Sequence, residues 1–249
     1  MSQDLQIAGH GLTGYPLAGD GHGSVTAPEG AGEHVQAVVF VRPDIAMSWQ
    51  RRGTAVPDDR KQQLLAVERI IRLNEWFMRV LGAVRACELP DAYVGGGVIR
   101  TIVWDYLHGY AVPSPLADVD VGFFNPLDLS PARDRIVEAQ LRAALPEVPW
   151  QAKNQAAVHL WYERVFGYAV PPLTSSQEAI ATFPETVTSI GVRLLLDGNL
   201  EIVAPCGLDD LLHMILRRNP RRVTVERFRQ RLAEKTILEK WPRVRIVDG

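Results

Sequence analysis

The chain has 249 residues, 47% hydrophobic and 22% charged, which is typical of a globular protein with one large domain or two small ones. This composition argues against a collagen-like fibre and wholesale disorder, and no stretch reaches the roughly 18 apolar residues that a membrane helix needs. The formal charge of −2 averages two unlike parts: residues 217–249 hold eleven Lys and Arg against four acidic residues, a balance of +7, and residues 1–216 have a balance of −9. The basic end is expected to be either a solvated helical surface or a face for a phosphate-rich partner.

Residues 1–56 are expected to form a flexible leader, because eight of the twenty glycines lie in the first 32 residues without apolar periodicity. A short strand is possible at residues 36–41. No basic flank followed by an apolar block begins the chain, so no secretory signal is expected. Cys87 and Cys206 form no C-x-x-C pair, and a reduced, cytoplasmic location is therefore expected.

The pattern changes at Pro57, and residues 57–249 are expected to form one folded domain. Apolar residues recur at helical spacing from the capping residues Asp58 and Asp59 until Pro90, which predicts one long helix. Strand-like and helix-like pieces then alternate: strand 92–94, helix 98–108, strand 118–124, helix 131–144, a strand near 149–155, helical segments 157–166 and 175–182, a hairpin over 186–204, and helices from 209 to about 217 and from about 223 to 237. This order predicts an α+β or α/β fold.

Three consecutive glycines, Gly95, Gly96 and Gly97, lie between a predicted strand and a predicted helix. Glycine lets the backbone approach a ligand closely, and the free N–H groups of a helix start attract anions, most often phosphate. Arg100, in the first helical turn, can direct a guanidinium into the same space. The alternative is a tight turn that needs glycine for its shape alone.

Asp118 and Asp120 are two positions apart on a predicted strand, so their carboxylates leave the same face, roughly 6–7 Å apart. Two such anions repel unless a cation neutralises them, and Mg²⁺ is commonly held by one or two carboxylates together with nucleotide phosphates. The alternative is a pair of solvated acids on an outer sheet face. The glycine turn upstream favours the metal interpretation.

The same segment partly matches the dinucleotide-binding pattern, in which strand, Gly-x-Gly and helix are followed by an acid some 20 residues later. Gly95, Gly97 and Asp118 match that spacing, but Arg100 occupies the place of the third glycine. Both aspartates also precede the apolar Phe123–Phe124 run instead of following it. The dinucleotide interpretation is therefore rejected.

Several blocks in order resemble the bacterial nucleotidyltransferase-like family of the polymerase-beta-like nucleotidyltransferase superfamily, over about residues 60 to 245. The blocks are VGGGVIR at 94–100, VWDYLHG at 103–109, DVDVGFF at 118–124, KNQAAVHLW at 153–161 and APCGLDD at 204–210. The pattern of Gly-Gly-x-Val-x-Arg followed by Asp-x-Asp also resembles tRNA nucleotidyltransferases, over this core only. The resemblance implies an α+β fold with a polymerase-beta-like core, a mixed sheet packed with helices.

This resemblance also implies a reaction: an acceptor hydroxyl attacks the α-phosphate of a nucleoside triphosphate, with Mg²⁺, two ions expected, and pyrophosphate is released. Gly95 and Gly96 match the phosphate turn of the family, and Asp118 and Asp120 match its metal pair. The superfamily usually places a third carboxylate on a later strand, and Glu201 is the candidate for it, as general base or second metal ligand. The nearer strand, residues 150–155, offers no acid.

The remaining site candidates lie on other predicted elements. Lys153 and Asn154 lead a polar cluster that continues through Gln155 and His159, and a substrate contact is expected there. Trp104 and His108 share a helix face with Arg100, so one interpretation is that the three line the pocket together. The favoured interpretation is that Trp104 and His108 are partly buried and make structural hydrogen bonds.

The sequence thus predicts a Mg²⁺-dependent nucleotidyltransferase that acts on a nucleoside triphosphate and an unidentified acceptor. No membrane contact is expected, and nothing in the sequence beyond the basic C-terminal stretch supports nucleic acid as a partner. The alternative is a catalytically inactive nucleotide-binding or regulatory protein with the same fold, which a missing third carboxylate would favour.

Overall fold

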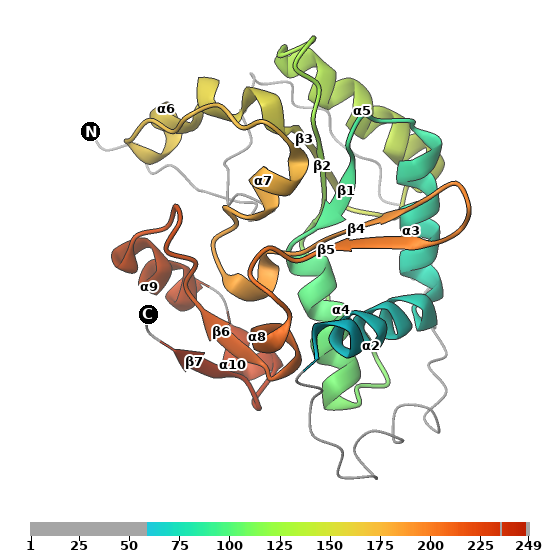
Figure 1. Cartoon of the computed structure of the whole chain (residues 1–249), viewed down its shortest axis with the longest axis vertical. Helices are drawn as coiled ribbons and strands as arrows, with labels where there is room; N and C mark the ends of the chain where they lie inside the picture. The colour runs from blue at the N-terminus through green and yellow to red at the C-terminus, as the bar shows by residue number, and fades with distance from the viewer. Residues whose placement is uncertain (1–58, 235, 248–249) are drawn as a thin grey trace, which may run out of the picture.

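The computed structural model describes residues 59–234 and 236–247 (Figure 1). The predicted leader at 1–56 and its possible strand at 36–41 lie outside the described residues. In the described part of the chain, no helix has the length and apolarity required to cross a bilayer.

The first described helices are α2 (Arg60–Leu73) and α3 (Glu75–Ala86), so the prediction of one long helix is wrong. Asp59 caps α2, and its side chain accepts a hydrogen bond from the Lys61 N–H. Asn74 ends α2 and caps α3, where its side chain accepts from the Phe77 N–H at 2.9 Å. The Asn74 backbone is extended, with φ −93° and ψ 90°, and this breaks the helical path between two segments that share an apolar pattern.

A five-stranded sheet forms the centre of the described residues, in the order β3-β2-β1-β4-β5. The strands are β1 (Tyr93–Gly95), β2 (Val119–Phe123), β3 (Trp150–Asn154), β4 (Gly191–Leu194) and β5 (Leu200–Val203). The β2–β3 pair is parallel and the other pairs are antiparallel, so the predicted mixed sheet is confirmed.

The main hydrophobic core lies on one face of this sheet. Val94, Val119, Val121 and Val192 are fully buried there, beneath the helices that Figure 1 shows along the sheet. These helices are α2 and α3 together with α4 (Gly97–His108) and α5 (Pro131–Ala144). Because side chains alternate along a strand, Asp118, Asp120, Tyr93 and Glu201 belong to the opposite face.

Short helical segments cover part of that opposite face. They are η1 (Gln155–Leu160) and α7 (Ser176–Ile180), and α6 (Tyr162–Phe166) packs on η1. The segment η2 (Thr186–Thr188) instead contacts α4 and the C-terminal elements. Ile180 of α7 packs so closely on β4 that a Cβ on Gly191 would lie 2.5 Å from its Cδ1. Glycine at position 191 is therefore required for α7 to rest on the sheet.

The C-terminal elements pack beside α4 and below α6 in the view of Figure 1. They are α8 (Asp209–Leu212), β6 (Ile215–Arg217), α9 (Val225–Glu234), α10 (Ile237–Lys240) and β7 (Arg245–Val247), with β6 and β7 paired in parallel. The predicted helix from 209 to about 217 is wrong, because Met214 takes a left-handed φ of 56° and the chain continues as a strand.

Candidate active site

The glycine turn joins β1 directly to α4. Gly96 has φ 72° and ψ −131°, a backbone conformation open essentially only to glycine, and its N–H donates to the Ile190 carbonyl at 3.1 Å. Helix α4 therefore begins abruptly at Gly97, and the N–H groups of its first turn have no partner within the helix. The start of this twelve-residue helix can bind an anion.

The two aspartates lie beside this turn, so the structure brings the two predicted features together. Asp120 stands opposite Gly95 in the antiparallel β1–β2 pair, and Asp118 immediately precedes the first residue of β2. Val119 and Val121 are fully buried on the core side, which leaves both carboxylates on the other face. Asp120 is 2% exposed, and Asp118 is partly buried.

Arg100 lies over the start of α4, held between two indole rings. Its guanidinium carbon is 5.6 Å from the ring centroid of Trp104 and 5.0 Å from that of Trp241, and a Cβ built on Gly97 would lie 3.8 Å from its Nη2. Burial lowers the pKa of Arg100, while the charges of Glu185 and Asp118 oppose that effect, and a guanidinium stays charged in any case. Its Nε is buried and has no hydrogen-bond partner among the described residues, so it remains able to donate to an anion.

The predicted substrate contacts on β3 are already engaged within the chain. The Asn154 amide donates to the carbonyls of Asn125 and Asp128, and its oxygen accepts from the N–H groups of Asn125 and Ala156. Lys153 forms an ion pair with Asp134 at 3.5 Å. Asn154 therefore anchors the loop after β2, and its side chain has no capacity left for a ligand.

Two glutamines occupy the strand region beside the aspartates. Gln151 of β3 stands directly opposite Asp120. A carboxylate at this position would have been the third acid nearest to the aspartate pair. Gln155 folds over β2, and its side chain would lie 3.5 Å from a Cβ on Gly122. Both residues place amides, not acids, next to the aspartate pair.

Glu201 does not approach the aspartates. Across the sheet, Asp120 is aligned with Gly95, Gly191 and Val203 on successive strands. Strand β5 is therefore three strand spacings from β2, about 14 Å at ~4.8 Å per strand. Glu201 lies two residues further along β5 than Val203. It accepts hydrogen bonds from Tyr93 Oη at 2.6 Å and Arg193 Nη2 at 2.7 Å.

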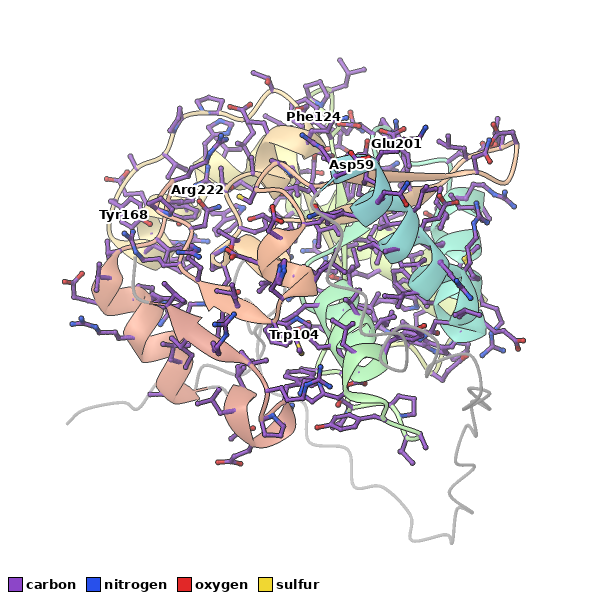
Figure 2. All side chains as sticks on the ribbon, turned by 60° about the horizontal axis from the view of Figure 1, so that its bottom comes forward. Asp59, Trp104, Phe124, Tyr168, Glu201 and Arg222 are labelled. Carbon is purple, nitrogen blue, oxygen red and sulfur yellow. The ribbon has the colours of Figure 1, made fainter. Side chains whose placement is uncertain are left out.

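Figure 2 shows Glu201 on the side of the molecule away from Tyr168 and Arg222. Partial burial opposes its charge, but the hydrogen bonds from Tyr93 and Arg193 lower the pKa of Glu201 overall. These contacts support a structural role for Glu201 at the sheet edge.

The helix-face residues of α4 also make structural contacts, as the sequence predicted. Trp104 Nε1 donates to the Leu211 carbonyl at 2.9 Å, and His108 Nδ1 lies 2.7 Å from the Trp104 carbonyl. Asp105 accepts a hydrogen bond from Trp241 Nε1 at 2.7 Å. The bonds to Leu211 and from Trp241 fix α4 against the C-terminal elements and thereby help to hold the start of the helix in place.

A cavity of about 240 Å³ lies between α6 and α9, and the sequence interpretation missed it. We call it the arginine–tyrosine pocket, and its ring and guanidinium side chains come from Tyr162, Phe166, Tyr168, Phe183, Arg222, Arg227 and Arg231. The aromatic run at 161–168 and the basic stretch from 217 onward were visible in the sequence. Only the fold places them on the same cavity.

The carboxylates beside the glycine turn are suitable ligands for a hard divalent cation. In residues 59–234 and 236–247, no three or more His, Cys, Asp or Glu side chains are grouped as a metal site. Mg²⁺ requires fewer protein ligands than that, because it is usually held by one or two carboxylates and by substrate phosphates. Asp118 and Asp120 therefore fit a magnesium ion that arrives with a nucleotide.

Comparison with known proteins gives a consistent result. A family model described as Nucleotidyltransferase matches residues 82–246, about two thirds of the chain. No curated protein matches the chain.

Among solved structures, an NMR structure described as revealing a CCA-adding enzyme head domain is 28% identical, with a TM-score of 0.63. The match covers 74% of this chain and 95% of that one. A structure of a tRNA-processing enzyme complex is 16% identical, covers 65% of this chain and 40% of that one, and has a TM-score of 0.37. The apo form of a tRNA-processing enzyme is 15% identical, covers 78% and 45%, and also has a TM-score of 0.37. Of these three structures, only the first has a TM-score above 0.5, so the similarity in fold is judged from that structure alone.

Proposed function

Because the chain belongs to the nucleotidyltransferase family, we propose that it transfers a nucleoside monophosphate from a nucleoside triphosphate to an acceptor hydroxyl and releases pyrophosphate. The observation that carries this proposal is the register of β1 and β2. That register sets Asp120 opposite Gly95, beside the glycine turn and the start of α4. A site for phosphates and a pair of carboxylates thus share one corner of the sheet.

The triphosphate is expected to lie over the start of α4. The first-turn N–H groups and the positive end of the helix dipole favour the β- and γ-phosphates there. Arg100 adds a fixed positive charge, and its position between Trp104 and Trp241 restricts the guanidinium to one region. This arrangement orients the leaving pyrophosphate before the reaction begins.

Asp118 and Asp120 would hold magnesium, two ions being the expectation from the family resemblance. When bound, the metal would neutralise phosphate charge and lower the pKa of the attacking hydroxyl. Both carboxylates leave the sheet on one face beside the glycine turn, so a metal held by them would lie close to the phosphates of the nucleotide. In the overall reaction, the acceptor hydroxyl loses its proton to solvent, its oxygen forms a bond to the α-phosphorus, and the bond from that phosphorus to the pyrophosphate oxygen breaks.

A second candidate function is nucleotide binding without transfer. The observation that favours it is Gln151, an amide opposite Asp120 at the position nearest the pair, together with the distance of Glu201 from that pair. A protein with this arrangement would bind a triphosphate with Mg²⁺ and release no pyrophosphate. The two functions therefore differ in turnover and agree in binding.

The first test measures binding of the four ribonucleoside triphosphates to the full chain by calorimetry, with Mg²⁺ and with EDTA. We expect Asp118→Asn and Asp120→Asn to weaken Mg²⁺-dependent binding by about 10- to 100-fold, the usual cost of altering a metal site. Asp197→Asn, on the exposed turn between β4 and β5, is the matched control and should bind as the unaltered chain does. Unchanged binding in the Asp118/Asp120 double variant, with its fold intact, would overturn the proposal.

Turnover is measured in the same samples as pyrophosphate release, with cell RNA and small-molecule hydroxyl acceptors added. Release that depends on Asp118 and Asp120 supports transfer. Tight Mg²⁺-dependent binding with no release from any acceptor fraction supports the second function.

A further inference from the structure

The arginine–tyrosine pocket is rich in positive charge and aromatic surface. Arg222, Arg227 and Arg231 line it, and none of its lining residues is acidic. Arg231 is ion-paired with Glu185 outside the lining, at 2.9 Å. The charge presented by Arg222 and Arg227, beside four aromatic rings, favours a ligand that carries both a negative group and a flat ring.

The rings of this pocket are held in place by contacts within the chain. The Tyr162 and Phe166 centroids are 4.5 Å apart, and Tyr168 meets Tyr162 edge to face at 5.3 Å. The two tyrosine hydroxyls lie 3.0 Å apart, and Tyr168 Oη donates to the Arg222 carbonyl at 2.7 Å. Because these side chains are already fixed, ligand binding would cost little additional side-chain entropy.

Arg222 already stacks on an aromatic ring of the pocket, which is the kind of contact that the flat ring of a ligand would make. Its guanidinium carbon lies 5.0 Å from the Tyr162 ring centroid. Aromatic rings and guanidinium planes are the surfaces on which proteins stack unpaired bases, at about 1–3 kcal/mol per base. Figure 2 shows Arg222 and Tyr168 on the same side of the molecule, where the α6 loop meets the C-terminal segment.

The position of the pocket relative to the aspartates indicates which substrate it serves. Gly95 of the glycine turn lies opposite Asp120, and Gln155 lies over Gly122, two residues further along β2. Gln155 is also a wall of the pocket. Gln155 thus brings one wall of the pocket to the sheet face of the aspartates, on the side of Asp120 away from Asp118. An in-line displacement requires the attacking group to approach from the side opposite the leaving group.

The cavity is small for a complete nucleoside triphosphate. Its volume of about 240 Å³ is below the ~300 Å³ at which pockets for drug-sized molecules begin. It suits one base with part of its ribose, with a phosphate at the rim near the arginines.

From these observations we propose that the arginine–tyrosine pocket binds the acceptor through a nucleotide unit, a base with an adjoining phosphate. The proposal rests on the proposed function, since it assigns the attacking side of that reaction. A free nucleoside monophosphate and the 3′ end of an RNA chain both carry this unit, and the experiment separates them.

The test titrates the full chain, without Mg²⁺ or triphosphate, with each nucleoside 5′-monophosphate, with a trinucleotide RNA and with ribose 5-phosphate. We expect the ligands with a base to bind at least tenfold more tightly than ribose 5-phosphate. Tighter binding of the trinucleotide than of any monophosphate identifies an RNA end, and equal binding identifies a free nucleotide. Equal binding of ribose 5-phosphate would overturn the proposal, because a ring would then not be recognised.

Variants of two arginines test whether this binding occurs in the pocket. Arg222→Gln and Arg227→Gln should each weaken binding of the best ligand at least tenfold, and Arg222→Lys should restore only part of it, because lysine keeps the charge and loses the plane. Arg229→Gln is the matched control, since Arg229 is exposed on the same helix as Arg227 and outside the pocket. Thermal melts verify that each variant is folded, and unchanged binding in both glutamine variants would overturn the proposal.

The same titrations distinguish this proposal from the proposed function. Asp118→Asn and Asp120→Asn should weaken Mg²⁺-dependent triphosphate binding by about 10- to 100-fold and keep binding of the pocket ligand. If the aspartate variants keep triphosphate binding, the proposed function fails and the pocket result still stands. If the arginine variants alone have no effect, the pocket assignment fails and the proposed function stands.

Discussion

Glu201 shows how strongly a residue's neighbours decide its role. It pairs with Arg193, which also stacks on the Tyr93 ring at 4.6 Å, so three side chains on three adjacent strands form one cluster. Burial, followed by the hydrogen bond to Glu201, raises the pKa of Tyr93 to about 12. Tyr93 therefore remains a hydrogen-bond donor to the carboxylate throughout the physiological range.

We expect Glu201→Gln to lower the free energy of unfolding at pH 7 by about 1 kcal/mol, because the amide loses the charge that Arg193 pairs with. The pKa of Glu201 is below its ordinary value of 4.5, so the carboxylate stabilises the fold above that pH. The stabilisation is lost as pH falls below 4.5, and the difference between variant and unaltered chain should shrink there. Urea unfolding at pH 7, 5 and 3.5 measures it.

Glu68→Gln is the control, since Glu68 belongs to an exposed helical pair with Arg72 and should cost about 0.3–0.5 kcal/mol. Triphosphate binding should remain within twofold in Glu201→Gln. A tenfold loss of Mg²⁺-dependent triphosphate binding in a stable Glu201→Gln protein would contradict the structural role and indicate that Glu201 contributes to the active site.

At the scale of elements, the contact between α7 and β4 depends on the absence of a side chain at Gly191. A Cβ at position 191 would lie 2.5 Å from Ile180 Cδ1 and 3.2 Å from Tyr93 Cβ. Because Ile180 is itself buried, its side chain cannot simply swing into solvent. An added methyl group would displace α7 from the sheet.

Gly191→Ala should therefore destabilise the protein by about 1–3 kcal/mol, the usual cost of overpacking a core. Ile180→Val removes Cδ1 and should cost about 0.5–1.5 kcal/mol alone. The double variant should lose less than the sum of the two, as measured by urea unfolding. Strict additivity would mean that the two side chains do not meet.

Elements with local signals were predictable from the sequence. Helix α5 has the predicted bounds, because Pro131 follows Ser130 at the helix start and an amphipathic pattern continues to residue 144. The division of the first helix at Asn74 also had a local signal, an asparagine whose side chain caps the N–H three residues later, but the apolar repeat on both sides concealed it.

Features set by tertiary contacts were not predictable in this way. Strand β6 begins after Met214, whose positive φ has no sequence signature, and its partner β7 lies about 30 residues later. The sequence favoured Glu201 as a third acid because its strand has the right composition. The order of the strands decides the matter, and it sets β1 and β4 between Glu201 and the aspartates.

At the scale of the whole molecule, one buried ion pair connects the C-terminal helix α9 to the segment before β4. Arg231 and Glu185 are 2.9 Å apart, and both side chains are 5% exposed. Thr188 Oγ1 also donates to Glu185 at 3.0 Å. A charge in such surroundings needs its partner, so the pair makes the docking of α9 specific.

Arg231→Met should destabilise the protein by about 3–5 kcal/mol, because it leaves Glu185 buried without the arginine. Adding Glu185→Gln should recover at least about 1 kcal/mol of that loss. Breaking the more exposed Arg217–Asp210 pair with Arg217→Met should cost no more than about 1 kcal/mol. Equal losses from the two arginine variants, in calorimetric melts, would contradict the importance given to burial.

The stacking of Trp241 on Arg100 has a consequence for the timing of synthesis. Residue 241 is translated 141 positions after residue 100, which at ~5–20 residues per second means a delay of roughly 7–28 s. During that interval a growing chain contains the glycine turn and both aspartates, while the second indole face for Arg100 has not yet been made. The surroundings of Arg100 are thus completed only once residue 241 has been made, long after the glycine turn and the aspartates.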